Sequence, residues 1–266
     1  MADYWLITRD MMQREVMLAA PPKRIVSVVP SQTELLFDLE LEAEVVGITK
    51  FCIHPEKWFR SKERVGGTKQ LNIEKIASLQ PDLILANKEE NEKQQMEALE
   101  KIAPVWLSDI TTLPEALTMI EQVGNICDRS EKAKAISKGI QTAFESLQVS
   151  RQPLRVAYAI WRNPWMWAAA GTFIHDLLCR AGWENVLAGQ VRYPEISLEA
   201  VRHLNPELIL LSSEPYPFGE KHIPEVQAAC PGAKVILADG EMFSWYGSRL
   251  LQAPGYFERL IAAGQE

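Results

Sequence analysis

The chain has 266 residues, of which 47% are hydrophobic and 24% are charged, as in ordinary globular proteins. This length suffices for one large α/β domain or for two lobes of ordinary size. The formal net charge of −7 argues against nucleic-acid binding, because that binding relies on Lys and Arg side chains to neutralise phosphates. No run of the sequence approaches the roughly 18 apolar residues of a membrane span.

Sequence motifs for catalysis and for metal binding are missing. The chain has no GxSxG, P-loop or GxGxxG motif, and its histidines show no HExxH spacing. Its cysteines are too widely spaced for a CxxC pair, so we expect four free thiols. We therefore predict a protein that is not an enzyme, with no catalytic residues, no metal ligands and no cofactor of its own.

The N-terminal residues predict a hairpin rather than an export signal. Charged residues occupy positions where a signal peptide has an apolar core, namely Asp3, Arg9, Asp10, Arg14 and Glu15. The short apolar runs Tyr4–Thr8 and Glu15–Leu18 flank a polar turn, which is typical of a hairpin. We assign this hairpin to residues 1–21 and expect it to be peripheral to the main domain.

An N-terminal lobe is predicted over residues 22–127. The apolar run Ile25–Val29 is typical of a parallel strand that is covered on both faces, and Pro30 is expected to end it. Ser31 and Glu34 have the spacing of a capping box, so a helix is predicted to begin there.

An internal repeat indicates that the chain has two similar halves. The segment Asn72–Leu85 recurs as Ser197–Leu210 at a spacing of 125 residues. In each copy a cap-forming residue begins a short helix, a Pro ends it, and a buried strand follows. Strands that alternate with helices predict a mostly parallel sheet in each half. The C-terminal lobe is assigned to residues 153–266.

A long helix is predicted between the lobes, over residues 128–152. Asp128 and Glu131 have capping-box spacing, and apolar residues then recur at three- and four-residue steps until Pro153. The predicted fold class is therefore α/β, with two lobes, each containing a mostly parallel sheet flanked by helices, bridged by one long rigid helix.

Residues that follow the predicted strands are candidate ligand contacts, because open parallel sheets bind ligands at the carboxyl ends of their strands. In the C-terminal lobe these residues are rich in aromatic side chains, which suit a large, flat or partly apolar ligand in a cleft between the lobes. The alternative is that the rings pack in the core beneath the loops. The candidates are Phe51, His54, Trp161, Trp165, Trp167, Glu241, Phe243 and Trp245.

Glu74 and Glu199 are equivalent residues of the repeat, and they have two interpretations. Each is the second residue of a predicted helix, where a carboxylate interacts favourably with the helix dipole. Alternatively, their equivalent positions in two lobes suit a two-point contact with a pseudo-symmetric partner.

The chain resembles the cobalamin-type and siderophore-type substrate-binding proteins of ABC importers, whose two α/β lobes are joined by a single long helix. The resemblance extends from Arg24 to the C-terminal helix. It rests on the segments Arg24–Leu35, Val46–Ile48, Asn72–Leu85, Gly182–Asn185 and Ser197–Leu210.

The resemblance implies roles for several residues. One Glu in each lobe of such proteins pairs with Arg residues of the membrane permease, and Glu74 and Glu199 occupy the matching positions. Phe51 and Tyr193 match aromatic residues that line the cobalamin cleft, Trp167 is a looser match, and Glu241 matches an acidic cleft residue. The resemblance also implies a periplasmic or cell-envelope location, whereas a cytoplasmic location agrees with the missing export signal.

The ligand expected from the resemblance is a cobalt or iron chelate, with a corrinoid first and a ferric siderophore or haem as the alternative. Thr68 stands where cobalamin binders carry Trp, and Trp245 replaces an Arg near the last cleft loop. Arg162 and Lys69 are the only candidate side chains for binding an anionic siderophore. The expected partners are the ligand and an ABC permease, with no nucleic acid and a monomeric state. A cytoplasmic enzyme or carrier for a cofactor-like small molecule is the lower alternative.

Overall fold

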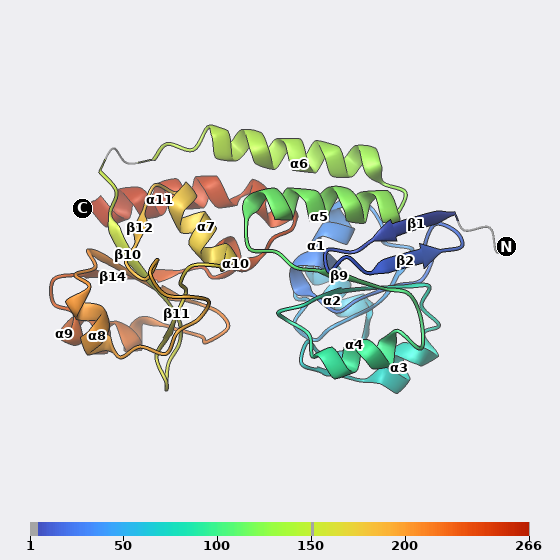
Figure 1. Cartoon of the computed structure of the whole chain (residues 1–266), viewed down its shortest axis with the longest axis horizontal. Coiled ribbons are helices and arrows are strands. Elements are labelled where there is room, and N and C mark those ends of the chain that lie inside the picture. The colour runs from blue at the N-terminus through green and yellow to red at the C-terminus, as the bar shows by residue number, and fades with distance from the viewer. Residues whose placement is uncertain (1–4, 150–151, 266) are drawn as a thin grey trace. The chain divides into compact units, whose positions relative to one another are not determined.

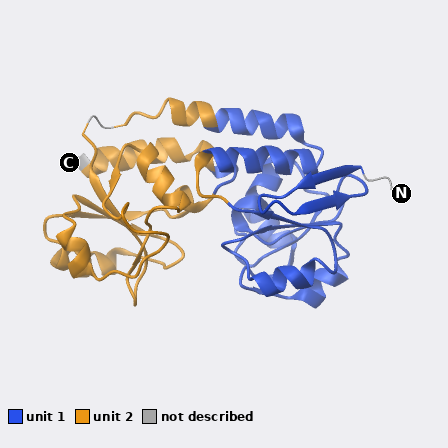
Figure 2. Cartoon of the chain, viewed as in Figure 1, with its two compact units in different colours: residues 1–109, 114–140, 246–249 blue, residues 110–113, 141–245, 250–266 orange. Residues whose placement is uncertain are grey.

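The computed structural model describes residues 5–149 and 152–265, which form two compact units (Figure 2). Unit 1 contains the chain up to Asp109 together with residues 114–140 and 246–249, and unit 2 contains residues 110–113, 141–245 and the chain from Leu250 onward. Each unit has a mostly parallel sheet of five strands with helices, which confirms the predicted α/β fold class. Within the described residues, no helix has the length and apolar character needed to cross a membrane.

The main sheet of unit 1 has the strand order β5-β4-β3-β8-β9, and all of its neighbouring strands are parallel. Its strands are β3 (Ile25–Ser27), β4 (Val45–Ile48), β5 (Glu63–Arg64), β8 (Leu83–Asn87) and β9 (Val105–Ser108). β3, β8 and β9 are buried along their whole length, which explains their continuous apolar sequences. A separate antiparallel hairpin is formed by β6 (Gly66–Gly67) and β7 (Gln70–Leu71).

The helices that follow the strands of unit 1 are α1 (Pro30–Asp38), α2 (Glu56–Ser61), α3 (Ile73–Ser78), α4 (Lys93–Leu99) and α5 (Leu113–Ile126). α3 lies beside α4 (Figure 1). The predicted capping box at the start of α1 does not form, because Val29 is the N-cap and Pro30 is the first helical residue. Pro suits this position since its missing N–H would have no partner within the helix.

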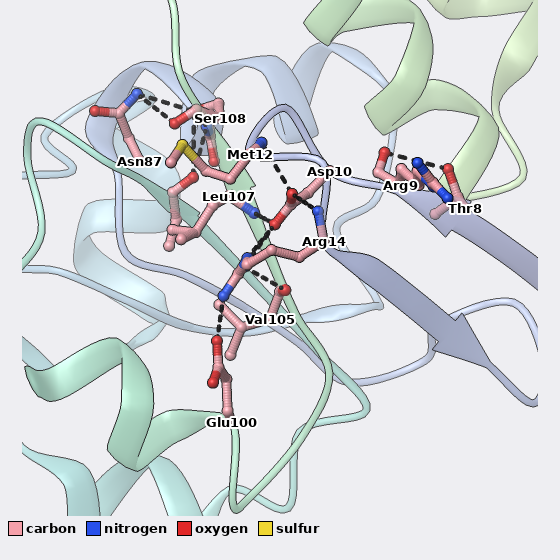
Figure 3. A network of polar contacts seen from close by, with 12 residues as sticks. Thr8, Arg9, Asp10, Met12, Arg14, Asn87, Glu100, Val105, Leu107 and Ser108 are labelled. Atoms are coloured by element: carbon pink, nitrogen blue, oxygen red, sulfur yellow. Dashed lines mark hydrogen bonds and ion pairs between the residues drawn. The ribbon is translucent and has the colours of Figure 1, made fainter. Parts of the chain in front are cut away.

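The N-terminal hairpin of β1 (Leu6–Arg9) and β2 (Glu15–Leu18) is attached to the rest of unit 1 by a network of polar contacts around the buried Asp10 (Figure 3). The Asp10 carboxylate accepts from the Arg14 backbone N–H at 2.9 Å and from Arg14 Nε at 2.7 Å. Arg14 also donates to Glu100 and to the Val105 carbonyl, and the Met11 N–H bonds the carbonyl of Leu107 in β9. The hairpin is therefore joined to β9, the edge strand of the main sheet, and its peripheral role stays a prediction.

The sheet of unit 2 repeats the plan of unit 1. Its order is β11-β10-β13-β14, with β12 also paired to β10, and β11 is the antiparallel member. Its strands are β10 (Arg155–Trp161), β11 (Met166–Trp167), β12 (Glu184–Asn185), β13 (Leu208–Ser212) and β14 (Lys234–Ala238). The register that pairs Ile25 with Leu83 in unit 1 recurs as Val156 paired with Leu208, which confirms the predicted repeat at the level of the sheet.

The helical elements of unit 2 are α7 (Phe173–Arg180), α8 (Leu198–His203), η1 (Glu220–His222), α9 (Ile223–Ala229), α10 (Glu241–Ser244), η2 (Ser248–Leu251) and α11 (Ala253–Gln265), with part of η2 in unit 1. α8 lies beside α9 (Figure 1) as α3 lies beside α4 in unit 1. Each unit thus has a short helix that precedes a central strand of its sheet, β8 or β13, and that packs on the next α-helix.

The helix predicted over 128–152 is observed as α6 (Ser130–Glu145), and the division between the units falls within it, after Ile140. Residues 150–151 lie outside the described residues. Asp128 is not the cap of α6. It has a left-handed φ of 56°, and the N–H groups of Asp128 and Arg129 bond the carbonyls of Asn125 and Gly124, which closes the end of α5. The bridging role of α6 stays a prediction.

Candidate ligand-binding and docking residues

An aromatic cluster gathers at the carboxyl ends of β10 and β13 in unit 2. Trp165 stacks on Trp167, with ring centroids 5.8 Å apart, and on Phe218 at 5.6 Å. Tyr216 contacts Phe218 at 4.6 Å and the edge of Trp161 at 5.5 Å. The local reason is that β10 ends at Trp161, with Trp165 and Trp167 in the turn and the β11 strand that follow it. The loop after β13 carries Tyr216 and Phe218.

The predicted ring residues of this cluster differ in accessibility. Trp161 is 39% exposed, whereas Trp167 has no accessible surface and its indole N–H donates to the Ile196 carbonyl at 2.8 Å. Trp165 is half-buried, and so is Tyr193, whose ring lies 5.6 Å from the Arg192 guanidinium. Trp161, Trp165 and Tyr193 can therefore present ring surface to a ligand, while Trp167 supports the cluster from the core.

Phe243 lies in the core of unit 2. It has no accessible surface, and its ring centroid is 4.9 Å from Tyr158, 4.7 Å from Phe257 and 6.3 Å from Trp183. Phe243 therefore matches the core alternative for the strand-end aromatic residues. Glu241, on the same short helix α10, is half-buried, and its backbone N–H bonds the Asp239 carboxylate at 3.1 Å.

Glu214 is a half-buried acidic residue that sequence reasoning did not select. Its Oε1 accepts from Ser244 Oγ at 2.5 Å and from the indole Nε1 of Trp245 at 3.0 Å. Burial raises the pKa of Glu214 even though the Ser244 hydrogen bond opposes the shift. Gly240 makes room for this carboxylate, since a Cβ there would lie 2.5 Å from Glu214 Cγ. Trp245 itself is only 6% exposed, so this bond holds its indole in place.

The strand ends of unit 1 carry one exposed ring over a polar core. Phe51, after β4, is 51% exposed, and Lys50 Nζ lies 5.0 Å from its centroid. His54, a few residues further on, is half-buried. Beneath them, Cys52 Sγ lies 3.1 Å from the Thr33 hydroxyl, and burial raises the pKa of this thiol to about 11. Cys52 is therefore a protonated core residue rather than a nucleophile.

The segment 246–249 belongs to unit 1 although the residues on both sides of it belong to unit 2. The Tyr246 hydroxyl donates to Glu90 at 2.7 Å. Arg249 binds both carboxylate oxygens of Glu34, with Nε at 2.9 Å and Nη2 at 2.6 Å. Burial raises the pKa of Glu34 despite this ion pair. Sequence reasoning missed the contact because the two partners are 215 residues apart.

Glu74 and Glu199 are both exposed in the first turn of equivalent helices. The N-cap of α3 is Asn72, whose side chain accepts from the Lys75 N–H at 2.9 Å. The N-cap of α8 is Ser197, whose hydroxyl accepts from the Ala200 N–H at 3.2 Å. The predicted caps are therefore confirmed. Glu74 and Glu199 occupy the same position of the repeated helix, one in each unit. Among the described residues, no group of three or more His, Cys, Asp or Glu side chains is arranged to hold a metal ion.

A family model described as periplasmic binding protein matches residues 25–229, and the chain belongs to this family of binding proteins. The family resemblance predicted from the sequence is confirmed. The vitamin B12-binding protein of Vibrio cholerae (strain ATCC 39315 / El Tor Inaba N16961) is 27% identical over 197 residues, which cover 72% of this chain and 71% of the relative. An uncharacterized ABC transporter substrate-binding lipoprotein of Bacillus subtilis (strain 168) is 27% identical over 213 residues, covering 76% of this chain and 67% of the relative.

Two solved structures have the same fold. The crystal structure of the periplasmic vitamin B12 binding protein of Vibrio cholerae matches with a TM-score of 0.75 and 24% identity, covering 92% of this chain and 99% of that chain. The periplasmic haem binding protein of the same organism matches with a TM-score of 0.76 and 21% identity, covering 90% of this chain and 98% of that chain.

Proposed function

We propose that the protein is the substrate-binding component of an ABC importer and that its ligand is a metal chelate. The observation that carries this proposal is the match of residues 25–229 to the periplasmic binding protein family. A corrinoid is the first candidate, supported by relatives named vitamin B12-binding protein. Haem or a ferric siderophore is the second, and the fold of the haem binding protein of Vibrio cholerae supports it. The metal chelate is transported cargo and not a resident cofactor.

The pairing of two cationic side chains, Arg162 and Lys69, favours a corrinoid over a polyanionic siderophore. Arg162 Nε donates to Glu225 at 2.9 Å, and Lys69 Nζ lies 3.5 Å from Glu92 and donates to the Glu89 carbonyl at 2.9 Å. An anionic ligand would have to displace these carboxylates before it could use either cation. The exposed rings, in contrast, bind a large ligand without any charge requirement.

We propose that the accessible strand-end residues contact the ligand, and that the buried ones hold them in place. The proposed contacts are Phe51, His54, Trp161, Trp165, Tyr193 and Glu241, with Trp167, Phe243 and Trp245 as supporting residues. Glu74 and Glu199 are proposed to dock the protein onto the permease, because exposed carboxylates in equivalent positions can pair with two Arg residues of a partner. The protein is further proposed to act in the periplasm or cell envelope, as a monomer without enzymatic activity or nucleic-acid binding.

The ligand proposal is tested by incubating the purified protein with cobalamin, cobinamide, haem and ferric siderophores and measuring which visible chromophore is retained after desalting. Trp161→Ala and Trp165→Ala should each weaken ligand binding by about 1–3 kcal/mol, as for an aromatic anchor of an interface. The matched control is Trp5→Ala, because Trp5 is 40% exposed on the N-terminal hairpin and should leave affinity unchanged. Retention of no chromophore would reject the metal-chelate proposal.

The docking proposal is tested with Glu74→Lys, Glu199→Lys and the double variant. Ligand affinity should survive, while stimulation of ATP hydrolysis by the reconstituted cognate transporter should be lost in the double variant. Glu131→Lys is the matched control, because Glu131 is also an exposed residue in the first turn of a helix. Full stimulation by the double variant would leave only the helix-dipole interpretation, worth about 0.3–1 kcal/mol of folding free energy per site.

A further inference from the structure

The two helices that carry Glu74 and Glu199 end in the same way. After α3, Gln80 has a φ of 47°, and after α8, Asn205 has a φ of 49°, so both residues are left-handed. Each is followed directly by a Pro. The N–H groups of Gln80 and Asn205 bond the carbonyls of Ala77 and Arg202. Pro has no N–H, so the helix cannot continue, and the C-cap carbonyls of Leu79 and Leu204 have no partner further along the helix.

An arginine supplies these donors in each unit. Arg24 Nε and Nη2 donate to the Leu79 carbonyl at 2.8 and 2.6 Å, and Nε also donates to the Gln80 carbonyl at 3.2 Å. In unit 2, Arg155 Nη2 donates to the Leu204 carbonyl at 2.7 Å, and its Nε donates to the Asn205 carbonyl at 3.2 Å. The acceptors are equivalent residues of the repeat, so the same cap is built twice.

The backbone of each arginine is fixed by an acidic residue that precedes the next strand. The Arg24 N–H donates to the Asp82 carboxylate at 2.9 Å, and the Asp82 N–H donates to the Arg24 carbonyl at 2.9 Å. The Arg155 N–H donates to the Glu207 carboxylate at 2.9 Å, and the Glu207 N–H donates to the Arg155 carbonyl at 2.8 Å. Each arginine thus joins the start of one strand, the end of the helix and the start of the adjacent strand.

Both helices are too short to be stable without contacts to the rest of their unit. Each has six residues, and isolated helices shorter than about 12 residues are marginal in water. α3 is fixed by the Asn72 cap, by the buried Ile76 and by Arg24, and α8 is fixed by Ser197, Val201 and Arg155 in the same three ways. Without the arginine, the C-terminal end of each helix, opposite the end that carries the Glu, loses its hydrogen bonds from a charged side chain.

We infer that Arg24 and Arg155 are positioning residues for docking: they set the direction of α3 and α8, and so the points from which Glu74 and Glu199 meet the permease. This inference rests on the proposed docking function. Pairs of carboxylate and guanidinium groups are directional, so a tilt of either helix costs docking affinity while the strand ends that face the ligand keep their geometry.

The experiment compares Arg24→Ala, Arg155→Ala and the double variant in the full-length protein. The measurements are ligand affinity from the visible chromophore and the protein concentration that half-maximally stimulates ATP hydrolysis by the reconstituted transporter. The double variant should require about tenfold more protein for stimulation, because weakened charge pairing lowers affinity for the partner, with ligand affinity unchanged. Arg129→Ala and Arg180→Ala are controls, since both side chains form ion pairs that do not involve α3 or α8.

A second comparison separates positioning from general stability. In a protein that already carries Glu74→Ala, Arg24→Ala should have no further effect on stimulation, because it acts through that carboxylate. Glu199→Ala should likewise remove the effect of Arg155→Ala. The double variant Arg24→Lys with Arg155→Lys keeps a charged donor at each site and should recover part of the lost stimulation. If the Ala variants do not fold, stimulation is compared between this double variant and the parent protein. Unchanged stimulation, or an equal loss in the background without the Glu residues, overturns the inference alone. A parent protein that binds ligand but never stimulates the transporter overturns the docking function together with it.

Discussion

Arg249→Met should destabilise unit 1 strongly, because it removes one half of a buried ion pair. Arg249 and Glu34 are joined by two hydrogen bonds, and their side chains are only 9% and 14% exposed. After the change, the Glu34 carboxylate remains buried without its guanidinium partner. Breaking a buried pair from one side typically costs about 3–5 kcal/mol, and we expect a loss of that size in the free energy of unfolding near neutral pH.

The loss should shrink as the pH falls. Burial already raises the pKa of Glu34 above its ordinary value of 4.5, and the Arg249 hydrogen bond and charge are the main effects that oppose the shift. Without Arg249 the pKa of Glu34 rises further. A raised carboxyl pKa in the folded state contributes stability at low pH, and that contribution is lost as the pH rises through the folded pKa. Between the folded pKa of Glu34 and its ordinary value of 4.5, the free energy of unfolding of the variant should rise by about 1.4 kcal/mol for each unit by which the pH falls.

Urea titrations at a series of pH values between about 7 and about 5 measure the free energy of unfolding. They give both the loss of stability near neutral pH and its dependence on pH. The control is the double change Glu34→Gln with Arg249→Met, which removes both charges and should lie much closer to the parent. A slope that persists in the double variant comes from other groups. A deficit below about 1 kcal/mol, or one that does not depend on pH, would refute the reasoning.

Three further outcomes are expected. Glu214→Gln should raise stability near neutral pH and flatten its pH dependence in urea titrations, because burial raises the pKa of Glu214 above 4.5 and the charged form is unfavourable above that value. Gly124→Ala should lower the thermal unfolding temperature and cost about 1–3 kcal/mol, since its Cβ would lie 2.1 Å from an alanine Cβ in α6, whereas Gly189→Ala has no neighbour within 4 Å and should be neutral. Arg14→Ala should expose the N-terminal hairpin to limited proteolysis, because it leaves the buried Asp10 carboxylate without its cation; an unchanged cleavage pattern would contradict this.

Local patterns in the sequence predicted the secondary structure and the repeat. The segment that follows Asn72 and the one that follows Ser197 were assigned as capped helices leading into buried strands, and the structure has both with their side-chain caps. These features depend on neighbours within a few residues, so the sequence carries them directly. The bounds of α1 and α6 were less accurate, because Pro30 and Asp128 can each serve the end of one element or the start of the next.

The partners of the charged residues were decided only by the tertiary structure. Nothing near Glu34 in the sequence points to Arg249, and nothing near Arg24 points to the carbonyl of Leu79. The same holds for the strand-end rings: Trp161 and Phe243 follow strands in the same way, yet one is 39% exposed and the other has no accessible surface. A large aromatic side chain suits a ligand site and a core equally well. Which of these it occupies depends on what the rest of the chain packs against it, and that is a property of the long-range path of the backbone rather than of the local sequence.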